Sequence, residues 1–282
     1  MSVPTGPMRT FDHRHYRPSE LARVKEGRCV TVCLPARDEA ATVGLIVGSV
    51  MAELHARHGL VDEVVVVDDG SVDGTAELAR SAGARVVPAH GTGKGAAMQK
   101  GLQESRGDLV VFCDADLRHF DPCFVVGLVG PLFTHEHICL VKGCYDRPYG
   151  SRWGEGGRVT ELVAKPLLRT LLPHLSWLGQ PLAGECAGRR DVLEQVPFVT
   201  GYGVDIALVI DVFRRFGAGA VAQADLGRRF HRNRPLEELG PQAEAVIRTV
   251  LARAGLGEPV AACPPLVDQQ RLIDPPTYIA SQ

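Results

Sequence analysis

Short apolar runs that alternate with helix-forming segments constrain the fold of this chain more than any other feature. Four runs are rich in valine or leucine, as strands buried on both faces usually are, and they cover residues 29–34, 64–67, 84–87 and 109–112. Between the first two runs, apolar residues recur at helical spacing from Val43 to Leu54. Strands that alternate with helices predict a mostly parallel sheet with helices on both faces over the first 116 residues.

The pattern loosens beyond residue 118. There the sequence predicts a strand at 138–142 and helices at 124–133, 158–172, 205–216 and 241–254. Residues 145–157 hold four glycines and have the length of a lid or a binding loop. Residues 184–188 are expected to form a turn, residues 1–20 a poorly ordered arm, and the proline-rich end of the chain an irregular tail.

The composition of the 282-residue chain excludes several classes of protein. Apolar residues make up 45% and charged residues 23%, and a formal net charge of −2 provides no basic field for nucleic acid. No apolar run approaches the ~18 residues that a transmembrane helix needs, and the first 20 residues lack the apolar segment of a secretory signal. Eight cysteines without a Cys-x-x-Cys pair favour a cytoplasmic protein with reduced thiols and disfavour a cysteine zinc site.

Two aspartates, Asp114 and Asp116, follow the strand predicted at 109–112. Ligands of open α/β sheets bind outside the carboxyl ends of the strands, and side chains at i and i+2 of an extended segment point the same way. Both carboxylates can therefore converge on one hard divalent cation such as Mg²⁺ or Mn²⁺, which prefers oxygen ligands. Because Asp-x-Asp is a short pattern, the pair fits equally well with solvated carboxylates that end a strand.

The loops after the other three predicted strands reach the same edge of the sheet. They carry Arg37, Asp38, Glu39, Asp68, Asp69 and Lys94. The loop at 90–95 combines glycines with Lys94, so its backbone N–H groups and one point charge suit a phosphate. It lacks the spacing of a Walker loop, and no Gly-x-Gly-x-x-Gly follows a strand. Together the four loops predict a site for a nucleoside diphosphate beside a metal ion.

Several motifs resemble those of a known enzyme family. The front half resembles the nucleotide-sugar half of GT-A glycosyltransferases at 35–39 (Pro-Ala-Arg-Asp-Glu), 68–71 (Asp-Asp-Gly-Ser), 93–95 (Gly-Lys-Gly) and 114–116 (Asp-Ala-Asp). Three motifs of the second half are similar to the glucosyl-3-phosphoglycerate synthase family and are not shared by glycosyltransferases at large; they lie at 157–168, 201–205 and 231–240. The resemblance covers the chain from about residue 10 to residue 254.

The resemblance implies an α/β fold of the GT-A type, in which a Rossmann-like, mostly parallel sheet carries a C-terminal acceptor-binding lobe. Residues 1–118 would bind the nucleotide sugar, residues 119–254 would bind the acceptor, and residues 255–282 would form the irregular tail. The implied enzyme is a retaining, metal-dependent hexosyltransferase that moves glucose from a nucleoside diphosphate sugar, usually UDP-glucose, to 3-phosphoglycerate. It would be a cytoplasmic homodimer without a nucleic-acid or membrane partner.

Carried over residue by residue, the resemblance also implies roles for the site residues. The metal ligands would be Asp114, Asp116 and His231. The catalytic residues would be Asp116 and Asp205, and Asp205 stands where the family has a glutamate. The donor would be bound by Pro35, Ala36, Arg37, Glu39, Asp68, Asp69, Lys94, Asp114, Ala115, Asp116 and Tyr202. The acceptor's phosphate and carboxylate would be bound by Gly157, Arg158, Val159, Thr160 and Asn233.

Other functions fit parts of the same sequence. An enzyme of the same fold with a different small phosphorylated or carboxylated acceptor would share nearly every motif. A glycosyltransferase acting on a lipid phosphate would share the front half, but it would need a membrane helix or a basic amphipathic anchor. A sugar-nucleotide pyrophosphorylase would need a glycine- and arginine-rich loop where this chain has 35–37 (Pro-Ala-Arg). A non-catalytic nucleotide-sugar-binding protein would not need the full set of Lys94, Asp114, Asp116, Arg158 and His231.

Overall fold

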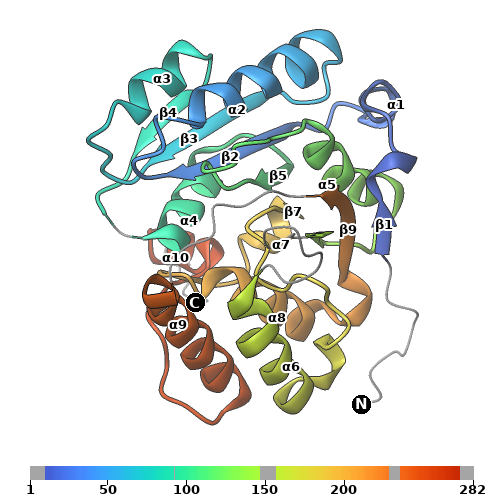
Figure 1. Cartoon of the computed structure of the whole chain (residues 1–282). Helices are drawn as coiled ribbons and strands as arrows, with labels where there is room; N and C mark the ends of the chain where they lie inside the picture. Colours follow the sequence, from blue (N-terminus) through green and yellow to red (C-terminus); the bar gives the residue numbers. More distant parts are fainter. Residues whose placement is uncertain (1–9, 92, 147–156, 229–235, 274–282) are drawn as a thin grey trace, which may run out of the picture.

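One sheet with helices on both faces forms the frame of the molecule (Figure 1). The computed structural model describes residues 10–91, 93–146, 157–228 and 236–273. Within these ranges eight strands pair in the order β1-β9-β6-β7-β5-β2-β3-β4. Their bounds are β1 Thr10–Asp12, β2 Val30–Ala36, β3 Glu63–Asp68, β4 Arg85–Pro88, β5 Leu109–Phe112, β6 Leu140–Asp146, β7 Cys186–Arg189 and β9 Val221–Arg228. A separate pair joins β8 (Phe198–Val199) to β10 (Ala262–Cys263).

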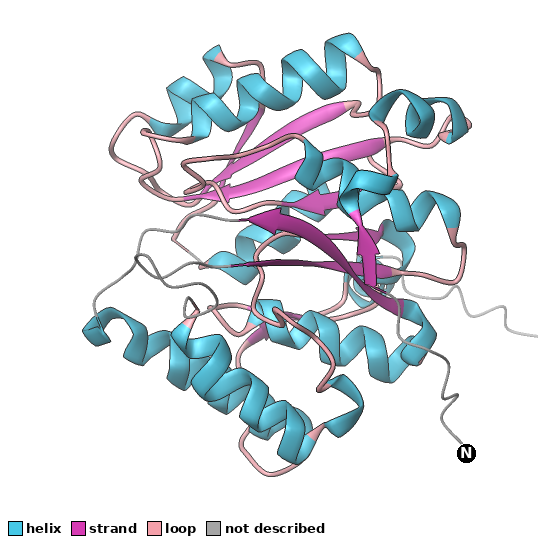
Figure 2. Cartoon of the chain, turned by 45° about the vertical axis from the view of Figure 1, so that its right-hand side comes forward, coloured by secondary structure: helices cyan, strands magenta, loops and turns pink. Residues whose placement is uncertain are grey.

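Helices connect and cover these strands (Figure 2). They are α1 Pro18–Val24, α2 Val43–Ser49, α3 Thr75–Ser81, α4 Lys94–Glu104, α5 Cys123–Thr134, α6 Lys165–Leu171, α7 Arg190–Leu193, α8 Val204–Phe216, α9 Leu236–Ala254 and α10 Leu266–Ile273. Two π-helical segments extend them, Val50–Arg57 after α2 and Thr160–Ala164 before α6. In the part of the chain that the structure describes, no helix has the length and apolar character that crossing a bilayer requires.

Strand direction confirms the predicted α/β fold with a mostly parallel sheet. β5, β2, β3 and β4 are parallel neighbours, so their carboxyl ends lie along one edge. On the other side, β6, β9 and β1 are parallel to one another. Between these two groups β7 runs antiparallel to both β5 and β6. Because β5 belongs to the first proposed lobe and β7 to the second, the two lobes share one continuous sheet.

Alternate residues of the central strands pack into two separate cores. On β2, Val30, Val32 and Leu34 face the core that contains α2 and α5, whereas Cys33 faces the core that contains α4 and α8. None of these four side chains is exposed. Helices therefore cover both faces of the sheet, which is why the strand sequence is continuously apolar instead of alternating with polar residues.

The prediction of a turn at residues 184–188 is wrong, because β7 begins within this stretch at Cys186. The sequence of β7, Cys-Ala-Gly-Arg, lacks typical strand formers, but its backbone pairs with neighbours on both sides. Small residues also fit the crowded centre of the sheet: a Cβ on Gly188 would lie 2.9 Å from Cγ of Leu193. β9 has no clear strand signal in the sequence, because an aspartate and a glycine interrupt its apolar residues.

The two ends of the chain are more regular than expected where they are described. Residues 10–20, expected to belong to a poorly ordered arm, enter β1 and α1, and β1 pairs in parallel with β9. Residues 262–273, expected to be irregular, form β10 and α10, where the Pro264 carbonyl accepts a 2.6 Å hydrogen bond from Nε2 of Gln99. Residues 147–156 of the predicted binding loop lie outside the described residues.

Gly101 lets α4 pack directly on β2, and this contact predicts a stability effect. A Cβ at this position would lie 2.2 Å from Sγ of the fully buried Cys33. We expect Gly101→Ala to lower the free energy of unfolding by about 1–3 kcal/mol, because an added methyl group forces a packed core to shift. Urea unfolding measures this change.

The matched control is Gly48→Ala on α2, where a Cβ would have no neighbour within 4 Å. This variant should raise the free energy of unfolding by up to about 1 kcal/mol, because alanine favours helix more than glycine does. Equal destabilisation of the two variants would contradict the close packing of α4 on β2.

Candidate functional site

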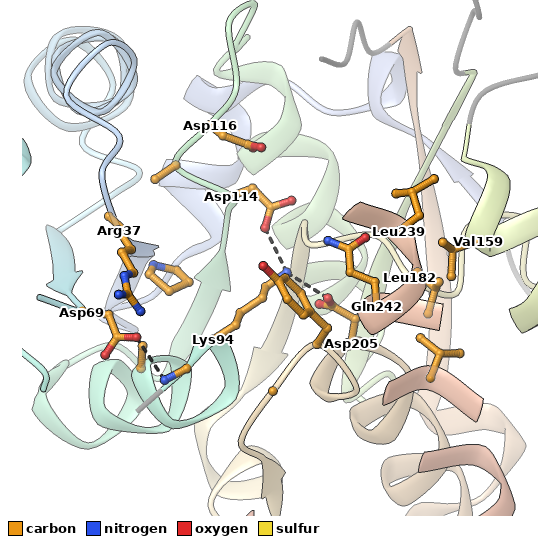
Figure 3. Close-up of a pocket in the computed structure, with 18 of the residues that line it drawn as sticks. Arg37, Asp69, Lys94, Asp114, Asp116, Val159, Leu182, Asp205, Leu239 and Gln242 are labelled. Carbon is orange, nitrogen blue, oxygen red and sulfur yellow. Dashed lines mark hydrogen bonds and ion pairs between the residues drawn. The ribbon is translucent and has the colours of Figure 1, made fainter. Parts of the chain in front are cut away.

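A cavity of about 540 Å³ opens at the carboxyl ends of the parallel strands (Figure 3). The loops that follow β2, β3, β4 and β5 all contribute to its wall, as the sequence predicted for this edge of the sheet. Figure 3 shows Arg37 and Asp69 at one end, Val159 and Leu182 at the other, and Lys94 between them. We call these the Arg37 end and the Val159 end.

Most of the predicted site residues meet in this cavity. Its lining includes Pro35, Ala36, Arg37, Glu39, Asp69, Lys94, Asp114, Ala115, Asp116, Gly157, Arg158, Val159, Thr160, Tyr202 and Asp205. Asp68 is not part of the lining. The remaining two predicted residues, His231 and Asn233, lie outside the described residues.

Asp68 and Asp69, at the end of β3, accept hydrogen bonds from different loops. Asp69 is nearly buried, and its Oδ2 accepts a 3.0 Å hydrogen bond from the backbone N–H of Gly93 (Figure 3). Oδ1 of Asp68 accepts a hydrogen bond from the backbone N–H of Ser71 at 3.3 Å, which closes the turn after the strand. Asp69 thus positions the glycine-rich loop, whereas Asp68 shapes its own turn.

Hydrogen bonds also join the loops to one another. The hydroxyl of Thr42 donates to the carbonyl of Ala115 at 2.6 Å, so the segment after β2 is tied to the loop after β5. The backbone N–H of Glu39 donates to Oγ1 of Thr75 at 2.8 Å, which ties the same segment to the start of α3. These bonds give the Arg37 end of the cavity a wall that is fixed before any ligand binds.

Lys94 lies between two carboxylates that come from different parts of the chain. Its Nζ is 3.0 Å from Oδ1 of Asp114, which follows β5, and 2.8 Å from Oδ2 of Asp205, which is in the first turn of α8 (Figure 3). Burial by itself would lower the pKa of the Lys94 ammonium, but the two carboxylates raise that pKa well above its ordinary value of 10.5. Lys94 is therefore a permanent cation in the middle of the cavity.

Gly184 has no side chain, and the carboxylate of Asp114 occupies the space that a side chain would fill. A Cβ at this position would lie 2.1 Å and 2.2 Å from the two carboxylate oxygens of Asp114. The carboxylate therefore packs directly against the backbone at residue 184, and this contact helps to fix its direction in the cavity.

The donor set of Asp114 and Asp116 fits a hard divalent cation. Both carboxylates line the cavity and come from one loop (Figure 3). Among the described residues there is no group of three or more His, Cys, Asp or Glu side chains placed to hold a metal ion. One or two carboxylates with substrate phosphates and water is a usual set of ligands for Mg²⁺, so these two residues suit an ion that binds together with a diphosphate.

The Val159 end carries a cation and a buried hydroxyl. Arg158 and the buried Thr160 stand at the start of a helical segment whose first turn, Thr160–Ala164, is π-helical. Such distortions are frequent at functional sites. Tyr202, 46% exposed, lines the cavity from the turn before α8. Arg158 and Thr160 offer hydrogen-bond donors for a small anionic molecule at this end, beside the apolar side chains of Val159 and Leu182.

Helix α9 forms a wall that the sequence analysis did not anticipate. Leu239, Gln242 and Val246 line the cavity from one face of this helix, and Leu182 lines it from the loop before β7. Their spacing of three and four residues is also that of an ordinary core helix, so no local signal distinguishes the two cases. Figure 3 shows the amide of Gln242 pointing into the cavity.

Known proteins are similar to this chain in both sequence and structure. A family model described as Glycosyl transferase family 2 matches residues 31–196. The chain is 46% identical over 263 residues to the glucosyl-3-phosphoglycerate synthase of Mycolicibacterium paratuberculosis, and the match covers 88% of this chain and 79% of that protein.

Solved structures agree with this match. The glucosyl-3-phosphoglycerate synthase from Mycobacterium tuberculosis in complex with Mn²⁺, UDP-glucose and phosphoglyceric acid matches with a TM-score of 0.85 at 42% identity, covering 93% of this chain and 99% of that chain. The mannosyl-3-phosphoglycerate synthase from Rubrobacter xylanophilus also matches with a TM-score of 0.85, at 36% identity, covering 92% of this chain and 97% of that chain.

The raised pKa of Lys94 predicts a contribution to stability that depends on pH. Because the folded-state pKa lies above 10.5, the ion pairs stabilise the fold fully at neutral pH, and this stabilisation is lost as the pH rises through the folded-state pKa. Lys94→Met leaves Asp114 and Asp205 without this cation, so its free energy of unfolding should be below that of the wild type at neutral pH. The difference should shrink once the pH exceeds 10.5.

Urea unfolding of both proteins from neutral to alkaline pH measures this difference. Lys100→Met is the control, because it removes a half-exposed pair with Glu104 on the same helix and should change stability little. A difference between Lys94→Met and wild type that stays constant into the alkaline range would contradict the ion-pair assignment.

Proposed function

The chain belongs to the glucosyl-3-phosphoglycerate synthases of glycosyl transferase family 2, and we propose that it transfers glucose from UDP-glucose to 3-phosphoglycerate with the help of a divalent metal ion. One observation carries this proposal: the aspartate pair, Lys94 and Arg158 line a single cavity at the ends of the parallel strands. Such a cavity offers ligands for a metal-bound diphosphate and for an anionic acceptor. No other function is needed to account for this set of side chains.

We assign the nucleotide to the Arg37 end of the cavity. Pro35, Ala36 and Glu39 line this end together with Arg37 and Asp69, on loops that hydrogen bonds already hold in place. A rigid wall lowers the entropic cost of ordering a bound nucleotide. The diphosphate then reaches the middle of the cavity, where Lys94 supplies a positive charge.

Asp114 and Asp116 are the described residues that would hold Mg²⁺ or Mn²⁺ there, and the family resemblance adds His231 as a third ligand. When bound, the metal ion neutralises the charge that builds up on the departing diphosphate. Lys94 adds a second positive charge to the same region, so the protein itself also stabilises the leaving group.

The acceptor belongs to the Val159 end. Arg158 presents a planar guanidinium that can bind a phosphate or carboxylate with two hydrogen bonds, and Thr160 stands two residues further on. The family resemblance adds Asn233 to this set. With 3-phosphoglycerate bound here, its free hydroxyl can lie next to the sugar that is held in the middle of the cavity.

Asp205 suits electrostatic stabilisation better than covalent catalysis. Retention of the anomeric configuration requires either a covalent nucleophile or attack from the face of the leaving group. Oδ2 of Asp205 is already paired with Lys94 at 2.8 Å, so this carboxylate is less available as a nucleophile. We therefore assign Asp205 to stabilising the positive charge that develops on the sugar, and a leaving-phosphate oxygen to accepting the proton of the acceptor hydroxyl.

The domain organisation and the assembly of the protein follow from the same family assignment. We propose that residues 1–118 act as the donor-binding lobe and residues 119–254 as the acceptor-binding lobe. We also propose a homodimer located in the cytoplasm. Light scattering of the purified protein tests the dimer, and a mass equal to the 30.4 kDa of one chain would contradict it.

Product formation from UDP-glucose and 3-phosphoglycerate with Mn²⁺ or Mg²⁺ tests the proposed function. Mass spectrometry and anomeric NMR should show an α-linked glucosyl-phosphoglycerate, and EDTA should abolish its formation. GDP-mannose is the comparison donor, because a mannosyl-3-phosphoglycerate synthase has a similar structure. If a product forms from GDP-mannose and not from UDP-glucose, the assignment of glucose as the transferred sugar is wrong. If UDP-glucose binds but no product forms, the assignment of 3-phosphoglycerate as the acceptor is wrong.

Gly184→Ala should remove most of the turnover by displacing Asp114. The added methyl group would overlap both carboxylate oxygens, so Asp114 would have to turn away from Lys94. We expect kcat to fall on the order of 100-fold, as is typical when a reacting group is misplaced by about 1 Å. Gly219→Ala, where a Cβ would have its nearest neighbour at 3.8 Å, is the matched control and should keep wild-type turnover. Wild-type kcat in Gly184→Ala would show that the position of Asp114 is not required.

Arg158→Ala should weaken binding of the acceptor and leave binding of the donor nearly unchanged. The loss of charge-assisted hydrogen bonds worth about 1.5–3 kcal/mol corresponds to a 10- to 100-fold rise in the KM for 3-phosphoglycerate. The KM for UDP-glucose should change little, because the nucleotide binds at the opposite end. Steady-state kinetics with each substrate varied in turn measures both constants, with Arg169→Ala on the exposed face of α6 as the control. Equal effects on both substrates would remove Arg158 from the acceptor site.

A further inference from the structure

A lysine with no exposed surface lies directly behind the cavity. Lys142 is on β6, an interior strand of the sheet, and its side chain is completely buried. Lysine is almost never buried in this way unless its charge is paired, since removing an ammonium group from water is costly. The groups around Lys142 should therefore include a partner for its charge.

The ammonium group of Lys142 contacts two segments of the cavity wall. Its Nζ donates a hydrogen bond to the carbonyl of Ala183 and another to the carbonyl of Asp205 at 3.3 Å. The same Nζ lies 3.8 Å from Oδ1 of Asp205. In the described part of the chain, Asp205 is the carboxylate within ion-pair distance of Lys142.

Asp205 thus stands between two lysines. Its Oδ2 is bound by Lys94 on the cavity side, and its Oδ1, which is buried and receives no hydrogen bond from the described residues, faces Lys142. With Asp114, these residues form a chain of two cations and two carboxylates, Lys142–Asp205–Lys94–Asp114, whose charges balance. Lys142 is the member that does not line the cavity.

The bond to Ala183 ties Lys142 to the backbone behind the cavity. Ala183 immediately precedes Gly184, whose backbone packs against both oxygens of Asp114. Asp205 is nevertheless the carboxylate that the ammonium group contacts directly. The direction of Asp205 therefore depends on Lys142, whereas Asp114 is held by Lys94 and by the space at Gly184.

We propose that Lys142 is a positioning residue for glucose transfer, which keeps the Asp205 carboxylate oriented towards the sugar. This inference rests on the proposed function. Lys94 is shared with Asp114 and, in the proposed complex, with the diphosphate of the donor, whereas Lys142 pairs with Asp205. Without Lys142, the carboxylate would lose its buried partner at the moment when its negative charge is needed.

Lys142→Met tests this role, because methionine has a similar length and no charge. We expect kcat to fall on the order of 100-fold, as for other changes that misplace a reacting group. Binding of UDP with Mn²⁺ should change little, because the nucleotide end of the cavity does not contact Lys142. In the Asp205→Asn background the same substitution should have almost no further effect on kcat, because Lys142 acts through Asp205.

Lys25→Met is the matched control. Lys25 is also a nearly buried lysine, and its Nζ lies 2.6 Å from Asp62, just before the first residue of β3. This pair is at the amino-terminal edge of the sheet, opposite the cavity. The variant should lose stability and keep the kcat of the wild type, which separates loss of a buried ion pair from loss of positioning.

Several outcomes would overturn the proposal. An unchanged kcat in Lys142→Met, or an equal loss of kcat in the wild-type and Asp205→Asn backgrounds, would show that Lys142 does not act on Asp205. Loss of UDP binding together with turnover would show a general structural defect. A wild-type protein that forms no product would instead refute the proposed function.

If Lys142→Met does not fold, Lys142→Gln replaces it in the same assays. A further measurement needs no variant of Lys142. Asp205→Asn removes a carboxylate that pairs with both lysines, whereas Asp114→Asn removes one that pairs with Lys94 and not with Lys142. Asp205→Asn should therefore lower the melting temperature more than Asp114→Asn does, and equal melting temperatures would overturn the pairing of Lys142 with Asp205.

Discussion

The placement of one ammonium group, that of Lys94, between two carboxylates is the interaction on which the cavity depends. Asp114 belongs to the loop after β5 and Asp205 to α8, 91 residues later in the chain. Without a shared cation, two carboxylates in a largely buried site would repel each other and lose their hydration. Lys94 therefore joins the loop after β5 to the first turn of α8 through one ammonium group in the middle of the cavity.

Close backbone packing makes this placement possible. A Cβ on Gly95 would lie 1.7 Å from the carbonyl oxygen of Val199, and the backbone N–H of Gly95 donates a hydrogen bond to the carbonyl of Thr200 at 3.1 Å. The first turn of α4 thus packs on the segment that leads into α8. Gly93 has a φ of 86°, which glycine adopts without strain, and it turns the chain into the helix. Glycines at these positions bring Lys94 within reach of Asp205.

The buried side chains behind the cavity form ion pairs whose charges balance. A buried ion pair contributes little net stability, because desolvation offsets much of the attraction, but removing one member is costly. The chain of Lys142, Asp205, Lys94 and Asp114 follows this rule, since each carboxylate has a lysine and each lysine has a carboxylate. The arrangement stabilises one set of side-chain directions in the middle of the cavity. Its value lies in orientation more than in folding energy.

Much of the nucleotide side could be predicted from the sequence. Continuous valine runs indicate strands covered on both faces, and parallel strands bring their loops to one edge, so Asp69, Lys94, Asp114 and Asp116 meet as expected. Asp68 shows the limit of this reasoning, because two adjacent aspartates at a strand end look alike until the turn gives them different partners. The motifs of the second half indicated the family, but not how their residues face the donor.

The sequence by itself determined the order of strands and helices in the first half, the edge of the sheet at which the cavity opens, and most of the residues that line its nucleotide side. These features depend on local periodicity and on the geometry that all parallel sheets share. Only the tertiary structure decided the reversed strand β7, the wall formed by α9, and the pairing of Lys142 with Asp205. These depend on contacts between residues far apart in the chain, and neither propensity nor spacing records which distant group will meet a given side chain.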